Sequence, residues 1–337
     1  MDDGAVKTLF LPFENGELPF PAEGAHWLFL NAALPHMSEH EWQNSLWCEQ
    51  GFRTNFLALQ RAGYRVAPRS GAKPFSGALV LLGKHRELNR SNIHRALEQS
   101  LSGGPVLIAG AKTSGIQAMR KELIDLLPIE QTLSKNHAQV FWCLRPESWV
   151  SQPASAQVVI SADGVQFETA PGMFSHKAAD AGSQMLGQHL GEVKGKAADF
   201  GAGWGYLSAM LLKNAPGVTA LDLFEADFAS LEAAKANLRA CASQTPTAFH
   251  WHDLLAEPVE GSYDAIVMNP PFHTSRSAEA SIGQRMIAAA AKALKPGGCL
   301  LMVANRELPY EDTLQRAFRR SERIDEDRQF KVIRAVK

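Results

Sequence analysis

The chain has 337 residues, of which 45% are hydrophobic and 20% charged, and its net charge is −1. This length predicts two domains, and the composition is that of a globular protein without the global positive charge of many nucleic-acid binders. No apolar run reaches the roughly 18 residues of a membrane span, and the acidic start lacks a signal-peptide pattern. The four cysteines lie far apart without CxxC spacing, which argues against a metal site or disulfides and predicts a cytoplasmic protein.

The first half of the chain contains apolar segments that predict buried parallel strands, at residues 26–32, 78–82 and 105–110. Its "GALVLLGKHRELNRSNIHRAL…SGGPVLIAG" has the same order of strand, polar loop, helix, Gly-Gly turn and strand as the later "YDAIVMNPPFHTSRSAEAS…KPGGCLLMVAN". We therefore predict a degenerate duplication, although two unrelated α/β domains would fit the same pattern. A stretch rich in Pro and Ser at residues 146–156 indicates a boundary, which predicts domains of residues 1–150 and 151–337.

The second half alternates strands and helices more clearly. Apolar, β-prone segments recur at residues 196–200, 218–225, 247–251, 264–268 and 299–304. Helical patterns separate several of them, which predicts an α/β fold with a mostly parallel sheet covered on both faces. The closing "QFKVIRAVK" follows a charged turn without a long helix, so we expect an antiparallel strand at or near the sheet edge.

A glycine-rich segment, "DFGAGWGYLS" at residues 199–208, follows the first of these strands and opens a helix. Glycines at alternate positions (Gly201, Gly203 and Gly205) let the backbone bend sharply and approach a ligand. The spacing is GxGxG after Asp199 rather than the GxGxxG of dinucleotide sites. We therefore expect a cofactor with a charged amino-acid end and no pyrophosphate.

Two acidic residues follow the next strands. Glu225 ends its strand at the spacing where an acid holds ribose hydroxyls, and Asp222, inside the same strand, is the competing candidate. Asp253 follows the third strand, where it could accept a hydrogen bond from an adenine amino group. Together with the glycine turn, these strand-end acids predict a nucleoside-type cofactor.

The segment "VMNPPFH", residues 267–273, leaves a buried strand through two adjacent prolines. Prolines remove two backbone donors and fix two φ angles, so the loop is stiff and poor in donors.

The segments "DFGAGWG" and "NPPFH", with an acid ending the second strand, resemble the class I S-adenosylmethionine-dependent methyltransferases that act on exocyclic or amide nitrogens. Within these, "PGMFSHKAADAGSQML", "MVANRELPYEDTL" and "FKVIRA" make the chain most similar to the bacterial guanine-N2 methyltransferases of 16S (small-subunit) ribosomal RNA. The resemblance covers residues 165–337 well and the first half more loosely. It implies two Rossmann-like methyltransferase domains in tandem, of which the N-terminal one is degenerate.

The same resemblance implies site residues. The cofactor S-adenosylmethionine would contact Asp199, the three glycines, Glu225, Asp253 and Asn269, with Phe174, Asp180 and Ser183 in a lid over it. A guanine 2-amino group is a poor nucleophile because it is conjugated with its ring. The side-chain oxygen of Asn269 and the carbonyl of Pro270 would accept its hydrogens, while Phe272 would stack on the extracted base. Pro271 and His273 are expected in the substrate loop, with an exposed bystander as the other interpretation of His273.

RNA contact is expected from local basic patches, of which Arg61, Arg65 and Arg69 form the clearest, although such a run also fits a solvated face. The resemblance implies the assembled small subunit as substrate. We expect a monomer without metal or membrane attachment. Two alternatives stay open: a protein-glutamine N5 methyltransferase acting on a release factor, and a non-catalytic RNA-binding assembly factor. DNA adenine methylation is disfavoured by Phe272, where tyrosine is usual.

Overall fold

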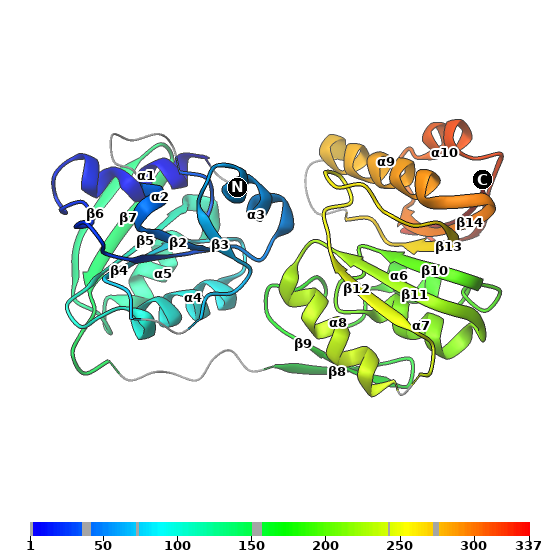
Figure 1. Ribbon diagram of the computed structural model, residues 1–337, viewed down its shortest axis with the longest axis horizontal. Coiled ribbons are helices and arrows are strands. Elements are labelled where there is room, and N and C mark those ends of the chain that lie inside the picture. Colours follow the sequence, from blue (N-terminus) through cyan, green and yellow to red (C-terminus); the bar gives the residue numbers. More distant parts are fainter. Residues whose placement is uncertain (1–2, 36–41, 72–73, 150–156, 242, 272–275) are drawn as a thin grey trace. The chain divides into compact units, whose positions relative to one another are not determined.

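In the computed structural model the chain divides into two compact units, residues 1–156 and 157–337. The structure describes residues 3–35, 42–71, 74–149, 157–241, 243–271 and 276–337, with the backbone alone at 276–280. In Figure 1 each unit shows a central sheet with helices on both faces. Among the described helices, none combines the length and apolar character that crossing a membrane requires.

The N-terminal unit contains a seven-stranded sheet in the order β3-β2-β1-β4-β5-β7-β6. Strands β1 to β5 pair in parallel, and β7 is antiparallel to β5. Helix α1 packs its apolar residues, such as Leu9 and Phe13, on one face, while α4 packs Ile93 and Leu97 on the other. The elements are α1 (Asp3–Glu14), β1 (Trp27–Leu30), α2 (Trp42–Ser45), β2 (Leu46–Glu49), α3 (Arg53–Arg61), β3 (Arg65–Ala67), β4 (Gly77–Leu81), α4 (Arg86–Gln99), β5 (Pro105–Ala111), the 3-10 helix η1 (Lys112–Ser114), α5 (Ile116–Leu123), β6 (Ile129–Lys135) and β7 (Ala138–Leu144).

The C-terminal unit repeats this topology, because its seven-stranded sheet has the order β12-β11-β10-β13-β14-β16-β15. A separate hairpin of β8 and β9 precedes it. The elements are β8 (Val158–Ala162), β9 (Val165–Thr169), α6 (Ala181–Gly187), β10 (Lys194–Phe200), α7 (Tyr206–Asn214), β11 (Gly217–Glu225), α8 (Phe228–Ala240), β12 (Thr247–Trp251), β13 (Tyr263–Met268), α9 (Arg276–Ala293), β14 (Leu294–Asn305), α10 (Glu311–Ala317), β15 (Arg320–Glu326) and β16 (Phe330–Val336).

Successive residues of the central strand β13 serve opposite faces of this sheet. Ala265 and Val267 join the core under α6, α7 and α8, whereas Ile266 and Met268 join the core under α9 and α10. The strand is therefore apolar throughout, as expected of a parallel strand buried on both sides.

The predicted fold class, two tandem α/β domains with mostly parallel sheets, is confirmed by the shared strand order. The predicted antiparallel strand at the end of the chain is β16, which pairs with β14 on one side and with the edge strand β15 on the other.

Candidate active site

The candidate site lies at the carboxyl edge of the C-terminal sheet, where β10, β11, β12 and β13 all end. These strands pair in parallel, with Phe200 opposite both Phe224 and Met268. Adjacent strands are about 4.8 Å apart, so the loops that follow them start side by side. The fold thus brings the glycine turn, Glu225, Asp253 and Asn269 to one edge.

The turn after β10 depends on its glycines. Gly201, Gly203 and Gly205 have φ angles of 77°, 54° and 91°. Residues that carry a Cβ rarely adopt these positive values. A Cβ on Gly205 would also meet the Leu238 side chain at 2.8 Å, so this glycine lets α7 start close to α8. A Cβ on Gly203 would meet nothing within 4 Å, so the turn faces open space where a ligand could approach the backbone.

Glu225 joins this turn to the end of β11. Its Oε2 accepts a hydrogen bond from the Gly203 N–H at 2.8 Å, and its Oε1 accepts one from the Asp227 N–H at 2.8 Å. Burial raises the pKa of Glu225 to about 7, against the lowering effect of these backbone donors. The competing candidate Asp222 lies within the sheet, where it accepts a hydrogen bond from the Tyr263 hydroxyl at 2.7 Å and forms an ion pair with Lys196 at 2.8 Å.

Asp199 lies fully buried beneath the turn, in β10. Its Oδ2 accepts a hydrogen bond from the Ser208 hydroxyl at 2.7 Å, whereas its Oδ1 has no hydrogen-bond partner among the described residues. Burial raises the pKa of this carboxyl to about 7. A buried acceptor without a partner costs stability, so this oxygen suits a cationic or N–H donor of a ligand.

Asp253, predicted to face an adenine, is buried just after β12. Its Oδ1 accepts a hydrogen bond from the Leu255 N–H at 2.9 Å, which shapes the turn that follows. The neighbouring His252 donates its backbone N–H to the Glu225 carbonyl at 2.9 Å. Asp253 is thereby held beside the end of β11.

Asn269 directly follows β13, and two residues at the start of α6 hold its side chain by hydrogen bonds. Its Nδ2 donates to Asp180 Oδ2 at 2.9 Å and to Ser183 Oγ at 2.8 Å. The next residue, Pro270, is buried and Pro271 is exposed. Phe272 and His273 lie outside the described residues.

The segment before α6 lies against the glycine turn. The Trp204 indole N–H donates to the Phe174 carbonyl at 2.8 Å, and the Phe174 ring is 37% exposed. The sequence patterns did not single out Trp204, nor Asn237, which is buried in α8 and donates to the Trp204 carbonyl at 2.9 Å. The available signal was a polar residue at helical spacing on the apolar face of that helix, with Leu231 and Ala234.

The predicted basic patch belongs to the N-terminal unit. Arg61 ends α3, Arg65 begins the edge strand β3 and Arg69 follows it, and all three side chains are exposed. The Arg65 guanidinium lies 5.7 Å from the centroid of the Trp47 ring. In the parts of the chain that the structure describes, no group of three or more His, Cys, Asp or Glu side chains could hold a metal ion.

Comparisons with known proteins relate the chain to methyltransferases. A family model described as the methyltransferase small domain matches residues 164–334. The ribosomal RNA small subunit methyltransferase C of Shigella flexneri is 31% identical over 298 residues, 88% of this chain and 83% of that protein. Its namesake from Shewanella loihica is 29% identical over 264 residues, 77% of this chain and 76% of that protein. A T. thermophilus 16S rRNA N2 methyltransferase, solved with AdoMet and guanosine, shares the fold with a TM-score of 0.82 at 23% identity, covering 99% of this chain and 92% of that one.

Proposed function

The chain belongs to the family of the ribosomal RNA small subunit methyltransferases C, and we propose that it methylates the exocyclic N2 of a guanosine in 16S rRNA, with S-adenosylmethionine as methyl donor. The family predicted from the sequence is confirmed. The observation that carries the proposal is the pairing of β10 with β13, which sets the glycine turn beside the Asn-Pro-Pro loop. A cofactor cradle and an acceptor-rich substrate loop thus share one edge of the sheet.

The residues at this edge fit S-adenosylmethionine. The partnerless oxygen of Asp199 would accept from the ammonium of its amino-acid end, and the open space at Gly203 would admit it close to the backbone. Glu225 would accept from the ribose hydroxyls, and Asp253 from the adenine amino group. When bound, S-adenosylmethionine supplies an electrophilic methyl group on a positively charged sulfur.

The chain's own residues prepare the guanine amine. Asn269 Oδ1 and the Pro270 carbonyl accept the two amino hydrogens, which favours a geometry where the nitrogen lone pair points out of the ring plane toward the methyl carbon. The prolines hold these acceptors ready before the base arrives. Transfer of the methyl group would release the neutral thioether of the cofactor and leave the amine positively charged, and the amine would then lose a proton to water. Phe272 is proposed to stack on the extracted base, and His273 to lie in the substrate loop.

The N-terminal unit is proposed to dock RNA and support the catalytic unit. The region that corresponds to the cofactor site is closed by its own polar groups: Asn31 Nδ2 donates to the Leu81 carbonyl at 2.8 Å, and Asn89 bonds both the N–H and the carbonyl of Gly83. These groups have hydrogen-bond partners within the unit, unlike the buried Oδ1 of Asp199, which has none among the described residues. We propose further that the protein acts as a monomer in the cytoplasm, on the assembled small subunit.

The proposal is tested on small subunits from a strain that lacks this protein. Incubation with the purified chain and S-adenosylmethionine, followed by mass mapping of 16S rRNA, should reveal one new N2-methylguanosine. Methyl transfer to a release-factor glutamine, or RNA binding without any methyl transfer, would instead favour one of the two alternatives left open by the sequence.

A further inference from the structure

We infer that Asp180 and Ser183 are positioning residues, which fix the orientation of the Asn269 amide so that its oxygen end faces the substrate. This inference rests on the proposed function, because it assigns the Asn269 oxygen to the guanine amine. It gives the two residues a role different from the cofactor contacts expected from the sequence.

The chemistry of the contacts determines the orientation. A primary amide has almost the same shape at its oxygen end and its nitrogen end, but a carboxylate can only accept hydrogen bonds. The 2.9 Å contact with Asp180 Oδ2 must therefore be made by Asn269 Nδ2. The second amide hydrogen goes to Ser183 Oγ at 2.8 Å. Both donors are thus used on the α6 side, and only the acceptor Oδ1 is left for the substrate.

The opposite orientation would defeat the proposed reaction. It would present two N–H donors to an amine that also needs to donate, and it would place the amide oxygen against the Asp180 carboxylate. Without Asp180 and Ser183, the side chain could populate both orientations. Fixing one of them in advance is the kind of preorganisation that lowers a reaction barrier.

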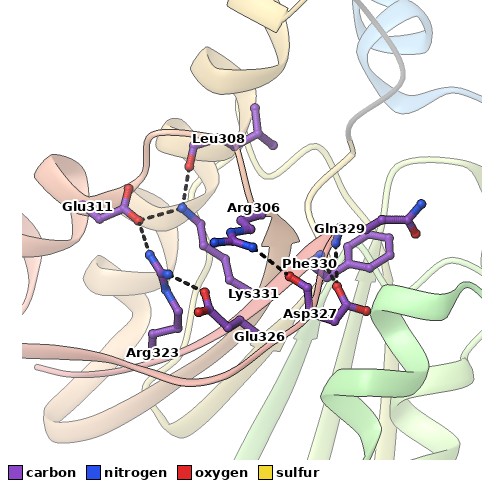
Figure 2. Close-up of polar contacts among 9 residues, drawn as sticks. All are labelled: Arg306, Leu308, Glu311, Arg323, Glu326, Asp327, Gln329, Phe330 and Lys331. Carbon is purple, nitrogen blue, oxygen red and sulfur yellow. Dashed lines mark hydrogen bonds and ion pairs between the residues drawn. The ribbon is translucent and has the colours of Figure 1, made fainter.

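Asp180 itself is held in place by the start of α6. The same Oδ2 accepts the Ser183 backbone N–H at 2.9 Å and so caps the start of α6. At Gly182 a Cβ would meet the Phe330 ring at 3.0 Å, so the first turn of α6 packs directly on β16. Figure 2 shows how the start of this strand is held: Asp327 Oδ1 accepts from the Phe330 N–H at 2.6 Å, and the buried Lys331 Nζ donates to the Leu308 carbonyl at 2.8 Å.

Helix α8 provides a natural comparison. Its cap, Asp227, accepts from the Ser230 N–H at 2.9 Å, so Ser230 has the same position relative to its cap as Ser183 has relative to Asp180. The two hydroxyls differ in their partners, because Ser230 Oγ donates back to Asp227 at 2.6 Å whereas Ser183 Oγ accepts from Asn269. Ser230→Ala is therefore a matched control for Ser183→Ala.

The first experiment compares these two variants. Ser183→Ala should slow single-turnover methyl transfer about fivefold, the scale of one hydrogen bond, without changing the affinity for S-adenosylmethionine. Ser230→Ala should leave the rate within about twofold of the wild type. An unchanged rate for Ser183→Ala, or a decrease confined to cofactor affinity, would overturn the inference.

The second experiment tests the orientation by rescue. Asn269→Asp sets a carboxylate against Asp180 and should lower the rate about 100-fold, whereas adding Asp180→Asn restores a donor–acceptor pair and should recover about tenfold. A double variant no faster than Asn269→Asp alone would contradict the proposed role. Melting temperatures of all variants separate these effects from misfolding.

A third measurement does not depend on activity. In a 15N spectrum, the side-chain NH2 protons of Asn269 should exchange slowly with water in the wild type and faster in Ser183→Ala. Rapid exchange in the wild type would refute the positioning. If the protons are protected but no subunit is methylated, the proposed function fails while the positioning of Asn269 stands.

Discussion

Gln50 of the N-terminal unit occupies the position on its sheet that Glu225 occupies in the C-terminal unit. Gln50 directly follows β2, and Glu225 is the last residue of β11. Gln50 Oε1 accepts a hydrogen bond from the Phe52 N–H at 2.8 Å, and Glu225 Oε1 accepts one from the Asp227 N–H at 2.8 Å. The other end of the side chain differs. Glu225 Oε2 accepts from the glycine turn, whereas Gln50 Nε2 donates to the Ala32 carbonyl at 2.5 Å.

Gln50 has an amide where Glu225 has a carboxylate, and this difference closes the turn after β1 in the N-terminal unit. A Gln side chain brings a donor that a carbonyl of the turn accepts, and it carries no charge for a ligand hydroxyl. The same strand order therefore occurs in a unit that has Gln50 where the other has Glu225, the proposed cofactor residue, in keeping with the proposed support role.

The proposed cofactor role of Glu225 leads to a prediction about affinity and pH. Glu225→Ala should weaken S-adenosylmethionine binding by about 1.5–3 kcal/mol, the value of a charge-assisted hydrogen-bond pair. Because burial raises the pKa of Glu225 to about 7, wild-type affinity should increase as the pH rises through that value and the carboxylate forms. Calorimetric titration on either side of this pKa measures both effects. Glu225→Gln should remove only the part of this profile that Glu225 contributes, because burial also raises the pKa of Asp199, the proposed acceptor of the cofactor's ammonium, to about 7. An unchanged affinity in Glu225→Ala would move the role to Asp222.

The buried Asp199 predicts a pH-dependent stability. Burial raises its pKa from the ordinary 3.8 to about 7 in the folded chain, so folding favours the protonated form. Its contribution to stability is then complete below the unfolded pKa and is lost as the pH rises through the folded value. The free energy of unfolding of Asp199→Asn, relative to wild type, should therefore rise between about pH 5 and pH 8, by on the order of 1–3 kcal/mol. Urea titrations at each pH test this, and a constant difference would contradict it.

The proposed catalytic role of Asn269 predicts a defect in the chemical step. Asn269→Ala removes an acceptor needed as the amine leaves conjugation, so single-turnover methyl transfer should fall roughly 100- to 1,000-fold with cofactor affinity close to normal. Phe272→Ala should instead weaken binding of the target base by about 1–3 kcal/mol. Wild-type transfer by Asn269→Ala would mean that the Asn-Pro-Pro loop is merely a stiff exit from β13.

The basic patch of the N-terminal unit predicts a salt-dependent effect on RNA binding. Replacing Arg61, Arg65 and Arg69 together with glutamine should weaken subunit binding and reduce the salt slope by roughly 0.7 for each phosphate that is no longer neutralised. Cofactor affinity should not change. A matched control replaces three exposed lysines of the same unit, Lys112, Lys121 and Lys135. Equal weakening in both triple variants, or a lower melting temperature with normal RNA binding, would argue against a dedicated docking patch.

The pair of Lys331 and Glu311, at 2.6 Å, predicts an asymmetric effect on stability (Figure 2). Lys331 is 2% exposed, so Glu311→Ala leaves a buried ammonium without its carboxylate partner. This variant should lower the free energy of unfolding by about 2 kcal/mol, less than for a fully buried pair because Glu311 is half exposed. Adding Lys331→Met should restore part of this decrease. Glu322→Ala, which breaks the exposed pair with Arg320, is the control and should cost less than about 1 kcal/mol. Urea unfolding measures the wild type and all three variants, and equal decreases for both glutamate variants would contradict the predicted asymmetry.

Local pattern was sufficient for the strands of the C-terminal sheet that are buried on both faces, whereas β2 and β7 of the N-terminal sheet were not predicted although most of their residues are buried. The predicted strand at residues 247–251 has the same bounds as β12, and the one at 264–268 differs from β13 by one residue. Strand β15, "RSERIDE", was not predicted, because an edge strand needs little apolar surface and charged side chains protect its open side. Strand β3 was missed because three residues are too few to show a period.

The candidate site was predictable for the same reason, since the ends of parallel strands meet at one edge whatever the helices between them do. The contact between Asn269 and Asp180 joins residues 89 positions apart, so no local pattern announces it. The same applies to Asn237, whose bond with the Trp204 carbonyl exists only once α8 packs beside the glycine turn.

The packing of Gly182 on Phe330 also imposes an order of events during synthesis. A ribosome releases α6 long before β16, and until that strand arrives the first turn of the helix lacks the Phe330 ring against which Gly182 packs. The growing chain can therefore complete its N-terminal unit, and much of its second sheet, while the amide of Asn269 still lacks a fixed support. An interrupted chain that stops short of Phe330 would leave the Gly182 face of α6 uncovered, and transiently exposed surface of this kind makes an incomplete chain prone to aggregation.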